Sequence, residues 1–395
     1  MLTFEMIQEA KRALEGIARK TPLDPAPKFG ANVYIKSENL QLTGAFKLRG
    51  AYNKIRSLTP EERERGVIAC SAGNHAQGIA LSAAKLGIRS IICMPAGAPI
   101  SKVEATRSYG AEVVLVPGVY DDAAREAERL TQEHGYTFAH PFNDPCVIAG
   151  QGTIGLEILE QLPEVEQVVV PIGGGGLISG VAMAVKTLKP SCRVIGVQAA
   201  GAASMYASRR AGRPVELDGV ATIADGIAVK KPGELTYEMV KNYVDDIALV
   251  TEDEIAAAIL ALIEKQKMIA EGAGAVSVAA AMFHKFPLEG KKVVSLISGG
   301  NIDVTSLSRV IDRGLMKSGR TTSLLIELAD KPGQLMEVSR IIAQCGGNVI
   351  SVHHERNGET ESINGCYLRL SLETRNYDHV QQITQALRDA GFKIV

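Results

Sequence analysis

A lysine follows a run of small residues in the segment TGAFKLRG, residues 43–50. We predict that this residue, Lys47, lies at the start of a helix, where its amine can be partly desolvated in a cleft. Desolvation lowers the pKa of a lysine, and the neutral amine can then form a Schiff base with a carbonyl compound. Because most lysines are solvated surface groups, this segment alone is weak evidence for catalysis.

A second polar segment, SAGNHAQG at residues 71–78, follows a predicted strand and opens a helix. Free N–H groups at a helix start bind carboxylates or phosphates, and the side chains of Ser71 and Asn74 can add hydrogen bonds. In the simpler alternative, Ser71 and Asn74 cap the helix and His75 packs in the core. The segment predicts an anion site, with capping as an open alternative.

Four consecutive glycines, Gly173, Gly174, Gly175 and Gly176, join a predicted buried strand to a helix that starts near Leu177. Glycines let the backbone approach a ligand and turn several N–H groups inward, which suits a phosphate dianion at a helix N-terminus. The segment matches neither GxGxxG nor the GK[ST] of a nucleotide-binding loop.

A fourth segment, SGGN at residues 298–301, comes after another predicted buried strand. The hydroxyl of Ser298 can hydrogen-bond a ring nitrogen; the alternative is a simple glycine turn. Together the four segments supply a lysine, a phosphate nest, a carboxylate loop and a partner for a ring nitrogen. An amino-acid enzyme that uses pyridoxal phosphate requires this set.

These segments need a scaffold that brings them to one cleft. Between residues 67 and 200, short β-branched runs (GVIACS, RSIICM, EVVLV, EQVVVPI and CRVIGVQ) alternate with stretches of helical length, which predicts buried parallel strands and crossover helices. Residues 247–250 and 292–297 continue as strands, 252–267 as a helix, and another helix starts near residue 303. We predict an α/β catalytic domain of two open lobes over residues 1–315, with a small lobe at about 44–145 inserted in the large one.

The character of the sequence changes after residue 315. Residues 316–320 are short, basic and contain Gly and Ser, which indicates a linker. Residues 321–395 then predict a separate βαββαβ domain. Its expected strands are 323–328, 348–353, 366–372 and 392–395, its helices are 333–344 and 377–390, and a polar hairpin joins the second and third strands.

Composition excludes several classes of function. The 395 residues carry 43 basic and 44 acidic side chains without a basic run, so nucleic acid is not expected as a partner. The six cysteines lie far apart, with no CxxC pair and no Cys/His cluster at zinc-ligand spacing, so we expect reduced thiols and no metal. Residues 5–20 carry charges at helical spacing and do not form the apolar core of a secretory signal peptide. No apolar run of about 18 residues, as a membrane-spanning helix needs, occurs either. We therefore expect a cytoplasmic protein without a membrane partner.

The order TGAFKLRG, SAGNHAQG, PIGGGGL, AEGAGA and SGGN closely resembles the fold-type II pyridoxal-phosphate enzymes, the tryptophan synthase β-like fold. Within them it resembles threonine ammonia-lyases and serine racemases, over nearly all of residues 1–315. The resemblance implies pyridoxal 5'-phosphate as cofactor. It also implies α,β-elimination that converts L-threonine to 2-oxobutyrate and ammonia, and L-serine to pyruvate and ammonia.

The same resemblance implies a role for each site residue. Lys47 is similar to the Schiff-base lysine and Phe46 to the residue against the cofactor ring; Asn74 would hold the ring hydroxyl. The phosphate would bind Gly173, Gly174, Gly175, Gly176 and Leu177, the pyridine nitrogen would bind Ser298, and Glu271 corresponds to an acidic residue near the ring. The substrate carboxylate would bind Ser71, Asn74 and His75.

Serine racemases carry a second serine directly after the first in the carboxylate loop, where it acts as an acid on the opposite face of the substrate. This chain has Ala72 there, as threonine ammonia-lyases do, so we prefer the lyase. A serine racemase, a β-replacement synthase and a non-catalytic amino-acid sensor are the alternatives.

Two further sets of residues have possible roles near the site. His140 and Phe142 are candidates for the lining of the substrate pocket. Asp225 resembles a residue that lies beside a bound cation in some relatives, although an Asp before Gly is more often a turn residue.

Residues 321–395 resemble an ACT domain, a module that often binds amino acids at a subunit interface; its most characteristic piece here is the turn DKPGQL at residues 330–335. The resemblance implies allosteric control by isoleucine or valine, with dimerisation alone or nucleotide control as alternatives. Because such enzymes are usually oligomers, we expect a homodimer or homotetramer.

Overall fold

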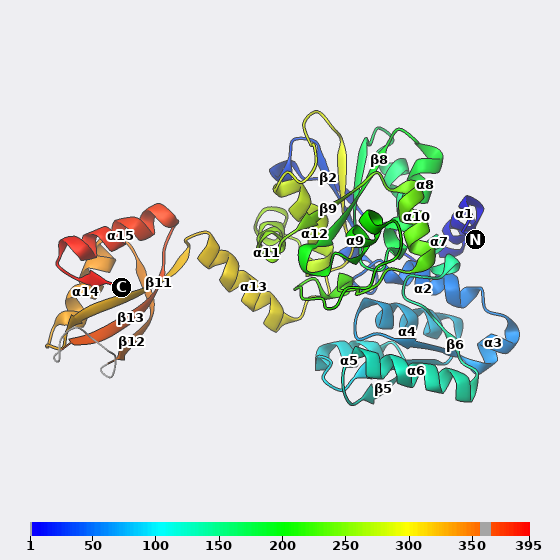
Figure 1. Ribbon diagram of the computed structural model, residues 1–395, viewed down its shortest axis with the longest axis horizontal. Helices are drawn as coiled ribbons and strands as arrows, with labels where there is room; N and C mark the ends of the chain where they lie inside the picture. The colour runs from blue at the N-terminus through cyan, green and yellow to red at the C-terminus, as the bar shows by residue number, and fades with distance from the viewer. Residues whose placement is uncertain (1, 356–364) are drawn as a thin grey trace. The chain divides into compact units, whose positions relative to one another are not determined.

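The computed structural model describes residues 2–355 and 365–395 (Figure 1). The chain divides into two compact units, Met1–Val304 and Thr305–Val395. Each unit has its own sheets and hydrophobic core, and each is described by itself.

The first unit contains a six-stranded sheet in the order β1-β2-β10-β7-β8-β9. All neighbours run parallel except β1, which pairs antiparallel with β2. Every residue of β7 and β10 is buried, as expected for parallel strands covered on both faces. The strands are β1 (Leu23–Pro25), β2 (Val33–Ser37), β7 (Gln167–Pro171), β8 (Arg193–Ala199), β9 (Asp246–Val250) and β10 (Val293–Ile297).

A second, four-stranded parallel sheet forms the small lobe, in the order β5-β4-β3-β6. Its strands are β3 (Val67–Cys70), β4 (Ser90–Pro95), β5 (Glu112–Val116) and β6 (Thr137–Phe138), all inside the range predicted for the small lobe. The two sheets confirm the predicted α/β fold with two lobes.

The helices of the first unit lie over these sheets, and α2 packs against both α4 and α7. The helix predicted over residues 252–267 is α11 followed by a π-helical segment, Leu262–Gln266. The helices are α1 (Phe4–Leu14), α2 (Lys47–Arg56), α3 (Pro60–Arg65), α4 (Asn74–Leu86), α5 (Ile100–Ser108), α6 (Tyr120–His134), α7 (Pro145–Gln161), α8 (Gly176–Leu188), α9 (Ser204–Ala211), α10 (Glu234–Tyr243), α11 (Glu252–Ala261) and α12 (Gly272–Met282).

A buried ionic cluster fixes helix α2 to the large lobe. Arg49 donates to both carboxylate oxygens of Glu38, at 2.8 Å each, and to Glu157 of α7 at 2.6 Å. Lys36 of β2 donates to the same Glu157. These charges are almost completely removed from water, and burial of an unpaired charge is costly. The ion pairs with their partners offset this cost. The cluster holds the segment that begins with Lys47 in place.

The second unit starts with α13 (Val304–Lys317) and continues as the predicted βαββαβ sequence. Its four strands form an antiparallel sheet in the order β12-β13-β11-β14, and one face of the sheet packs against α14 and α15. The elements are β11 (Thr321–Ala329), α14 (Gln334–Gln344), β12 (Asn348–Glu355), β13 (Gly365–Glu373), α15 (Tyr377–Asp389) and β14 (Lys393–Ile394).

The predicted domain limits differ in detail from the two compact units. The first unit ends at Val304, where α13 begins, whereas we expect the catalytic domain to extend to residue 315. This helix continues to Lys317, into the segment 316–320 that we expect to be a linker. The polar hairpin expected between β12 and β13, residues 356–364, lies outside the described residues.

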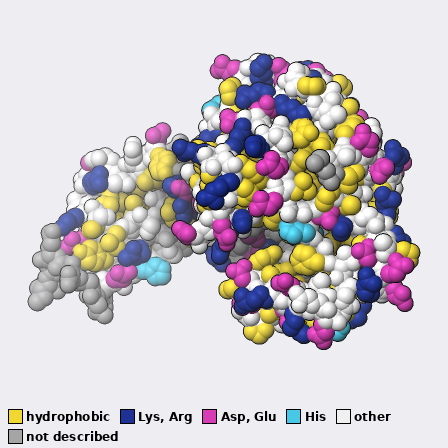
Figure 2. All heavy atoms as spheres, turned by 45° about the vertical axis from the view of Figure 1, so that its right-hand side comes forward, with side chains coloured by type: hydrophobic (Ala, Val, Ile, Leu, Met, Phe, Trp, Pro, Cys, Tyr) yellow, Lys and Arg dark blue, Asp and Glu magenta, His cyan; other side chains and the backbone are white. Residues whose placement is uncertain are grey.

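The surface of the first unit mixes charges of both signs. On the face shown in Figure 2, Lys and Arg side chains alternate with Asp and Glu side chains and do not gather by sign. This agrees with the formal net charge of −1. Across residues 2–355 and 365–395, no helix is both long enough and apolar enough to cross a membrane.

Candidate active site

Two segments far apart in sequence, 43–47 and 298–301, lie side by side at the end of β10. The N–H of Phe46 donates to the carbonyl of Ser298 at 3.0 Å, and the N–H of Gly300 donates to the carbonyl of Gly44 at 2.9 Å. The backbone therefore brings Lys47 next to Ser298, as the sequence predicts for loops at the ends of parallel strands.

Lys47 is the first residue of α2, and its amine is partly removed from solvent. Its Nζ donates to the carbonyl of Pro141 at 2.8 Å and lies 5.3 Å from the centre of the Phe46 ring. Burial lowers the pKa of Lys47 to about 8, against an opposing effect of the Glu271 carboxylate. A fraction of this amine is therefore neutral near neutral pH, which a lysine needs to act as a base or a nucleophile.

Asn74, the first residue of α4, links three of the predicted segments. Its Nδ2 donates to Oε1 of Glu271 at 2.7 Å, and its Oδ1 accepts from Nδ2 of Asn301 at 2.8 Å. Burial raises the pKa of Glu271 to about 7, and the nearby Asp225 acts in the same direction. The structure thus brings Asn74, Glu271 and the SGGN segment together, and Asn301 is a contact that the sequence did not single out.

The other residues of the carboxylate loop have different surroundings. The hydroxyl of Ser71 accepts from the N–H of Gly73 at 3.2 Å, while the space where a Cβ of Gly73 would point is open. His75 is buried, and its Nε2 lies 2.8 Å from the carbonyl of Ala139. Burial lowers the pKa of His75 to about 3, so the ring is neutral. Among the described residues, its Nδ1 has no hydrogen-bond partner.

The glycine loop connects β7 to α8 and is closely packed. Gly175 has φ of +97°, in the region that favours glycine, and it caps α8. The first intrahelical N–H is that of Ser179, which donates to Gly175, so the N–H groups of residues 176–178 start the helix without an intrahelical acceptor. A Cβ on Gly174 would lie 2.4 Å from the Phe142 ring. The loop therefore requires glycine and presents backbone N–H groups suited to a phosphate.

The loop 140–143 lies between the lysine and the glycine loop. The carbonyl of Pro141 meets Lys47, and Phe142 packs on Gly174 and Gly176. Nδ1 of His140 accepts from the N–H of Asn143 at 2.8 Å, and burial lowers the pKa of His140 to about 4. The sequence suggests His140 and Phe142 for the substrate pocket, whereas a backbone carbonyl such as that of Pro141 has no sequence signal.

Ser298 and Leu177 complete the predicted set. The hydroxyl of Ser298 is buried and donates to the carbonyl of Ala273 at 3.3 Å, in the first turn of α12. Leu177, the second residue of α8, is buried. The hydroxyl of Thr236, which the sequence did not suggest, donates to the carbonyl of Gly174 at 2.6 Å and steadies the glycine loop.

Asp225, which we considered for a cation, is engaged differently. Its Oδ2 accepts from Nζ of Lys102 at 2.8 Å, an ion pair between the segment 225–227 and helix α5. Among the described residues, the group of potential metal ligands that lie close together does not include Asp225. The ion pair spans from the large lobe to the small lobe close to Glu271.

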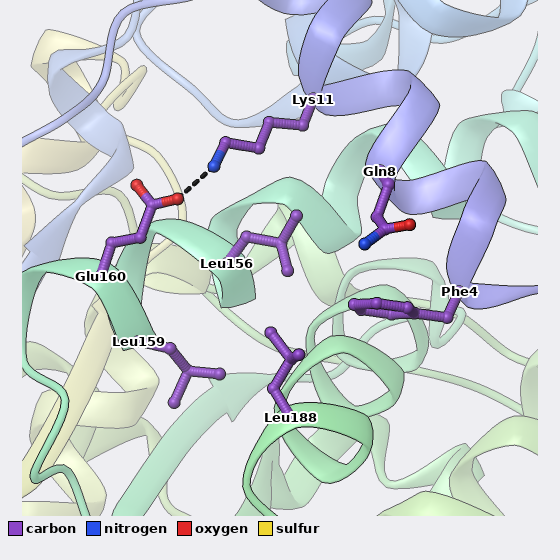
Figure 3. Close-up of a pocket in the computed structure, with 7 residues that line it drawn as sticks. All are labelled: Phe4, Gln8, Lys11, Leu156, Leu159, Glu160 and Leu188. Atoms are coloured by element: carbon purple, nitrogen blue, oxygen red, sulfur yellow. Dashed lines mark hydrogen bonds and ion pairs between the residues drawn. The ribbon is translucent and has the colours of Figure 1, made fainter.

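A groove of ≈ 360 Å³ lies elsewhere, between α1, α7 and α8 (Figure 3). Its walls are mainly apolar, with a Lys11–Glu160 ion pair at the side. None of the predicted site residues lines it, so we do not place the chemistry there. The lining residues are Phe4, Gln8, Lys11, Leu156, Leu159, Glu160 and Leu188.

Comparison with known proteins adds independent evidence. The family model described as "Pyridoxal-phosphate dependent enzyme" matches residues 14–299. The L-threonine ammonia-lyase of Thermotoga maritima is 52% identical over 398 aligned residues, covering 100% of this chain and 99% of the relative. The catabolic L-threonine dehydratase TdcB of Escherichia coli K12 is 49% identical over 315 residues, covering 78% of this chain and 96% of the relative.

Two solved structures of similar fold are those of a threonine deaminase and a serine racemase. The processed form of threonine deaminase isoform 2 from Solanum lycopersicum has a TM-score of 0.75 and 40% identity, over 79% of this chain and 88% of that one. Maize serine racemase has a TM-score of 0.75 and 36% identity, over 80% of this chain and 98% of that one.

Proposed function

The chain belongs to the family of pyridoxal-phosphate-dependent enzymes, and we propose that it is an L-threonine ammonia-lyase, which forms 2-oxobutyrate and ammonia from L-threonine. Similarity along the whole chain to the Thermotoga maritima enzyme supports this reaction. The observation that carries the proposal is the amine of Lys47, partly buried, at lowered pKa and held by the Pro141 carbonyl beside the glycine loop. L-Serine, one methyl group smaller, is the second substrate and would give pyruvate.

The residues present fit pyridoxal phosphate. The glycine loop leaves no room for a side chain at Gly174 but offers N–H groups at the start of α8, so it suits the phosphate. We assign the phosphate to residues 173–177, the ring hydroxyl to Asn74, the ring face to Phe46 and the pyridine nitrogen to Ser298. When bound, the cofactor supplies an electron-accepting ring that stabilises negative charge at the substrate Cα.

Lys47 has two functions in this proposal. It would hold the cofactor covalently, and its amine, when free, would remove the proton from the substrate Cα. Burial keeps the pKa of this amine at about 8, which is close to the working pH and so suits a general base. The carbonyl of Pro141, 2.8 Å away, orients the amine.

Ser298 and Glu271 set the electrostatics of the ring site. Ser298 offers a neutral hydroxyl, so it does not favour a proton on the pyridine nitrogen as a carboxylate would. Such a neutral partner would favour loss of the β-hydroxyl over transamination. Glu271, whose pKa is raised to about 7, remains protonated in part and so limits negative charge beside the ring.

The substrate carboxylate is assigned to the segment 71–75. The start of α4 directly after Gly73, where an added Cβ would meet nothing within 4 Å, supports this assignment, because N–H groups at a helix start bind carboxylates. The imidazole of His75 already contacts Ala139 through Nε2 and is neutral. We therefore expect His75 to contribute through its backbone N–H or its Nδ1 and not through positive charge.

A serine racemase is the nearest alternative, because maize serine racemase shares the fold. A racemase needs a proton donor on the second face of the substrate, and this chain has Ala72 at that position, packed against the core of the small lobe. A β-replacement synthase and a non-catalytic amino-acid sensor remain as further alternatives.

The assay that separates these functions uses the cofactor-loaded protein with L-threonine or L-serine. Release of 2-oxobutyrate and ammonia in equal amounts supports the lyase. D-Serine formation without 2-oxo acid would indicate a racemase, and a new amino acid formed only with an added thiol would indicate a synthase. A protein that never binds pyridoxal phosphate would support the sensor.

We further propose that the second unit is an ACT-like regulatory domain that binds isoleucine or valine, as part of an enzyme of isoleucine biosynthesis. Its βαββαβ order and the turn at residues 330–333 support this. We also propose a cytoplasmic homodimer or homotetramer. Calorimetric titration with isoleucine and valine tests the effector, and light scattering tests the oligomer; no heat together with unchanged activity would contradict the first.

A further inference from the structure

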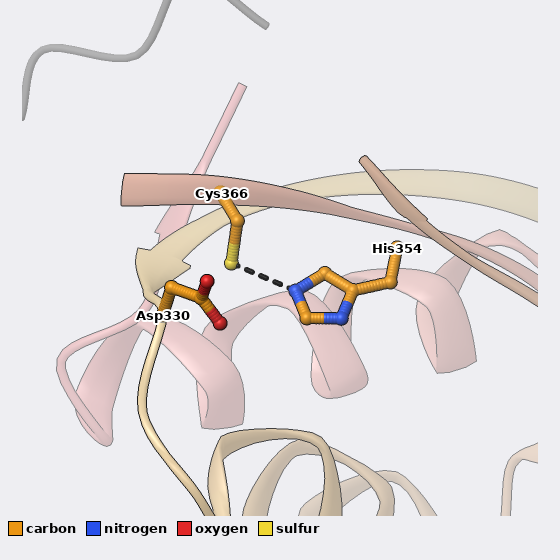
Figure 4. Close-up of side chains that lie close together, drawn as sticks. All are labelled: Asp330, His354 and Cys366. Carbon is orange, nitrogen blue, oxygen red and sulfur yellow. Dashed lines mark hydrogen bonds between the residues drawn. The ribbon is translucent and has the colours of Figure 1, made fainter. Parts of the chain in front are cut away.

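Three side chains of different chemistry converge at one end of the sheet in the second unit: Asp330, His354 and Cys366 (Figure 4). Their carboxylate, imidazole and thiol donor atoms all lie within 4.8 Å of one another. Nε2 of His354 is 3.0 Å from Sγ of Cys366. The three residues belong to the second unit and are not among the residues assigned to the active site above.

The strand register explains the convergence. Cys366 of β13 pairs with Leu328 of β11, and Leu368, two residues further along β13, pairs with His354 of β12. Side chains two residues apart lie on the same face of a strand, so Cys366 and His354 share one face of the sheet. Asp330 follows Leu328 by two residues and reaches the same end. Three adjacent strands thus position the three groups.

Burial distinguishes the three ligands. Cys366 is completely buried in the core between the sheet and its helices, whereas Asp330 and His354 are exposed. The thiol also lies 3.6 Å from the carbonyl of Leu328. The thiol therefore lies in a core strand, next to a carboxylate and an imidazole that belong to exposed residues.

We propose that Asp330, His354 and Cys366 form a zinc-binding site. Thiolate, imidazole and carboxylate are the three ligand types that Zn²⁺ takes in proteins, at about 2.3, 2.0 and 2.0 Å. Tetrahedral angles at these bond lengths separate the donor atoms by roughly 3.3–3.6 Å. The observed 3.0 Å between Nε2 and Sγ needs only a small opening to reach this. Mg²⁺ and Ca²⁺ prefer all-oxygen sites and do not fit a buried sulfur.

Binding changes the protonation of two ligands. The thiol of Cys366 loses its proton to the buffer and binds as thiolate, and His354 binds through Nε2 with its remaining proton on Nδ1. Three protein ligands leave a fourth position open for water or a small molecule. The bound ion would join the turn that starts at Asp330 to strands β12 and β13, so zinc should raise the unfolding temperature of this unit.

The test uses the full chain loaded with pyridoxal phosphate, stripped of metal by a chelator and kept reduced. After equilibration with ZnCl2 and dialysis, elemental analysis should find about one zinc ion per chain in this site. Cys366→Ser, His354→Asn and Asp330→Asn should each weaken zinc binding at least about tenfold, since loss of even an outer-shell partner costs about 10–100-fold. An excess of MgCl2 should not compete.

Two matched variants control for other cysteines and histidines of the same unit. Cys345 lies at the end of α14, and His353 is the neighbour of His354 on the other face of β12. Cys345→Ser and His353→Asn should bind zinc as the wild type does. If Cys366→Ser does not fold, the two exposed positions, Asp330 and His354, still decide the question. Wild-type protein that retains no zinc, or variants that bind it as tightly as the wild type, would overturn the proposal.

Discussion

The side chain of Asn74 donates a 2.7 Å hydrogen bond to Oε1 of Glu271. This bond joins the start of α4 in the small lobe to the residue that precedes α12 in the large lobe. Glu271 is almost completely buried, and its pKa is raised to about 7, chiefly by burial. Both protonation states of this carboxyl group are therefore populated near neutral pH.

The first prediction concerns the pH dependence of stability. Because the pKa of Glu271 is higher in the folded chain than the ordinary value of 4.5, the unfolded state loses its proton first as the pH rises. The free energy of unfolding should therefore fall between about pH 4.5 and 7, by roughly 3 kcal/mol from this group. Glu271→Gln keeps an acceptor for Asn74 and should remove this loss.

Urea denaturation of the cofactor-free protein at pH 5 and pH 8 measures the effect. Glu271→Gln should gain stability relative to wild type at pH 8 but not at pH 5, and Glu216→Gln, at an exposed position, serves as the control. If Glu271→Gln changed the free energy of unfolding equally at both pH values, folding would not raise the pKa of Glu271.

The second prediction concerns the ionic cluster behind Lys47. Arg49→Met removes the ion-pair partner of the buried Glu38 carboxylate and leaves Glu157 with Lys36 alone. We expect a loss of about 3–5 kcal/mol in the free energy of unfolding. Arg129→Met, at an exposed pair with Glu126, should cost far less, because water screens exposed ion pairs. Denaturation of both variants at pH 7 measures the difference; similar losses would mean that burial does not govern the cluster.

The third prediction concerns the glycine loop. Gly174→Ala places a Cβ 2.4 Å from the Phe142 ring, so the loop must shift and its N–H groups lose their alignment. A displacement of this size should lower kcat/KM with L-threonine by roughly 100-fold and weaken cofactor binding. Gly219→Ala is the control, since a Cβ there meets nothing within 4 Å. Unchanged cofactor affinity in Gly174→Ala would exclude this loop as the phosphate site.

Much of the fold could be predicted from the sequence. The buried parallel strands are continuous runs rich in β-branched residues, and the stretches between these runs are long enough to form helices. All four strands and both helices of the βαββαβ sequence lie where the alternation of apolar residues predicts them. The exact end of α13 and the π-helical segment Leu262–Gln266 were not predicted, since they depend on tertiary packing and not on local pattern.

The site was predictable only as far as side-chain types signal chemistry. Lys47, Asn74, Ser298 and the glycine loop stood out, and the structure brings their segments together. The contact of Lys47 with the Pro141 carbonyl could not be predicted, because every residue has a backbone carbonyl. Asp330, His354 and Cys366 were missed as well, since their sequence spacing fits no zinc motif and only the strand order unites them.

The proposed function depends above all on covalent binding of the cofactor by Lys47. The most direct measurement is borohydride reduction of the protein loaded with pyridoxal phosphate, followed by peptide mapping, for wild type, Lys47→Ala and the exposed control Lys28→Ala. We expect one pyridoxyl label on Lys47 in wild type and in Lys28→Ala, and none in Lys47→Ala. We also expect 2-oxobutyrate release to fall at least about 1,000-fold in Lys47→Ala alone. A label on another lysine, or full activity without Lys47, would contradict it.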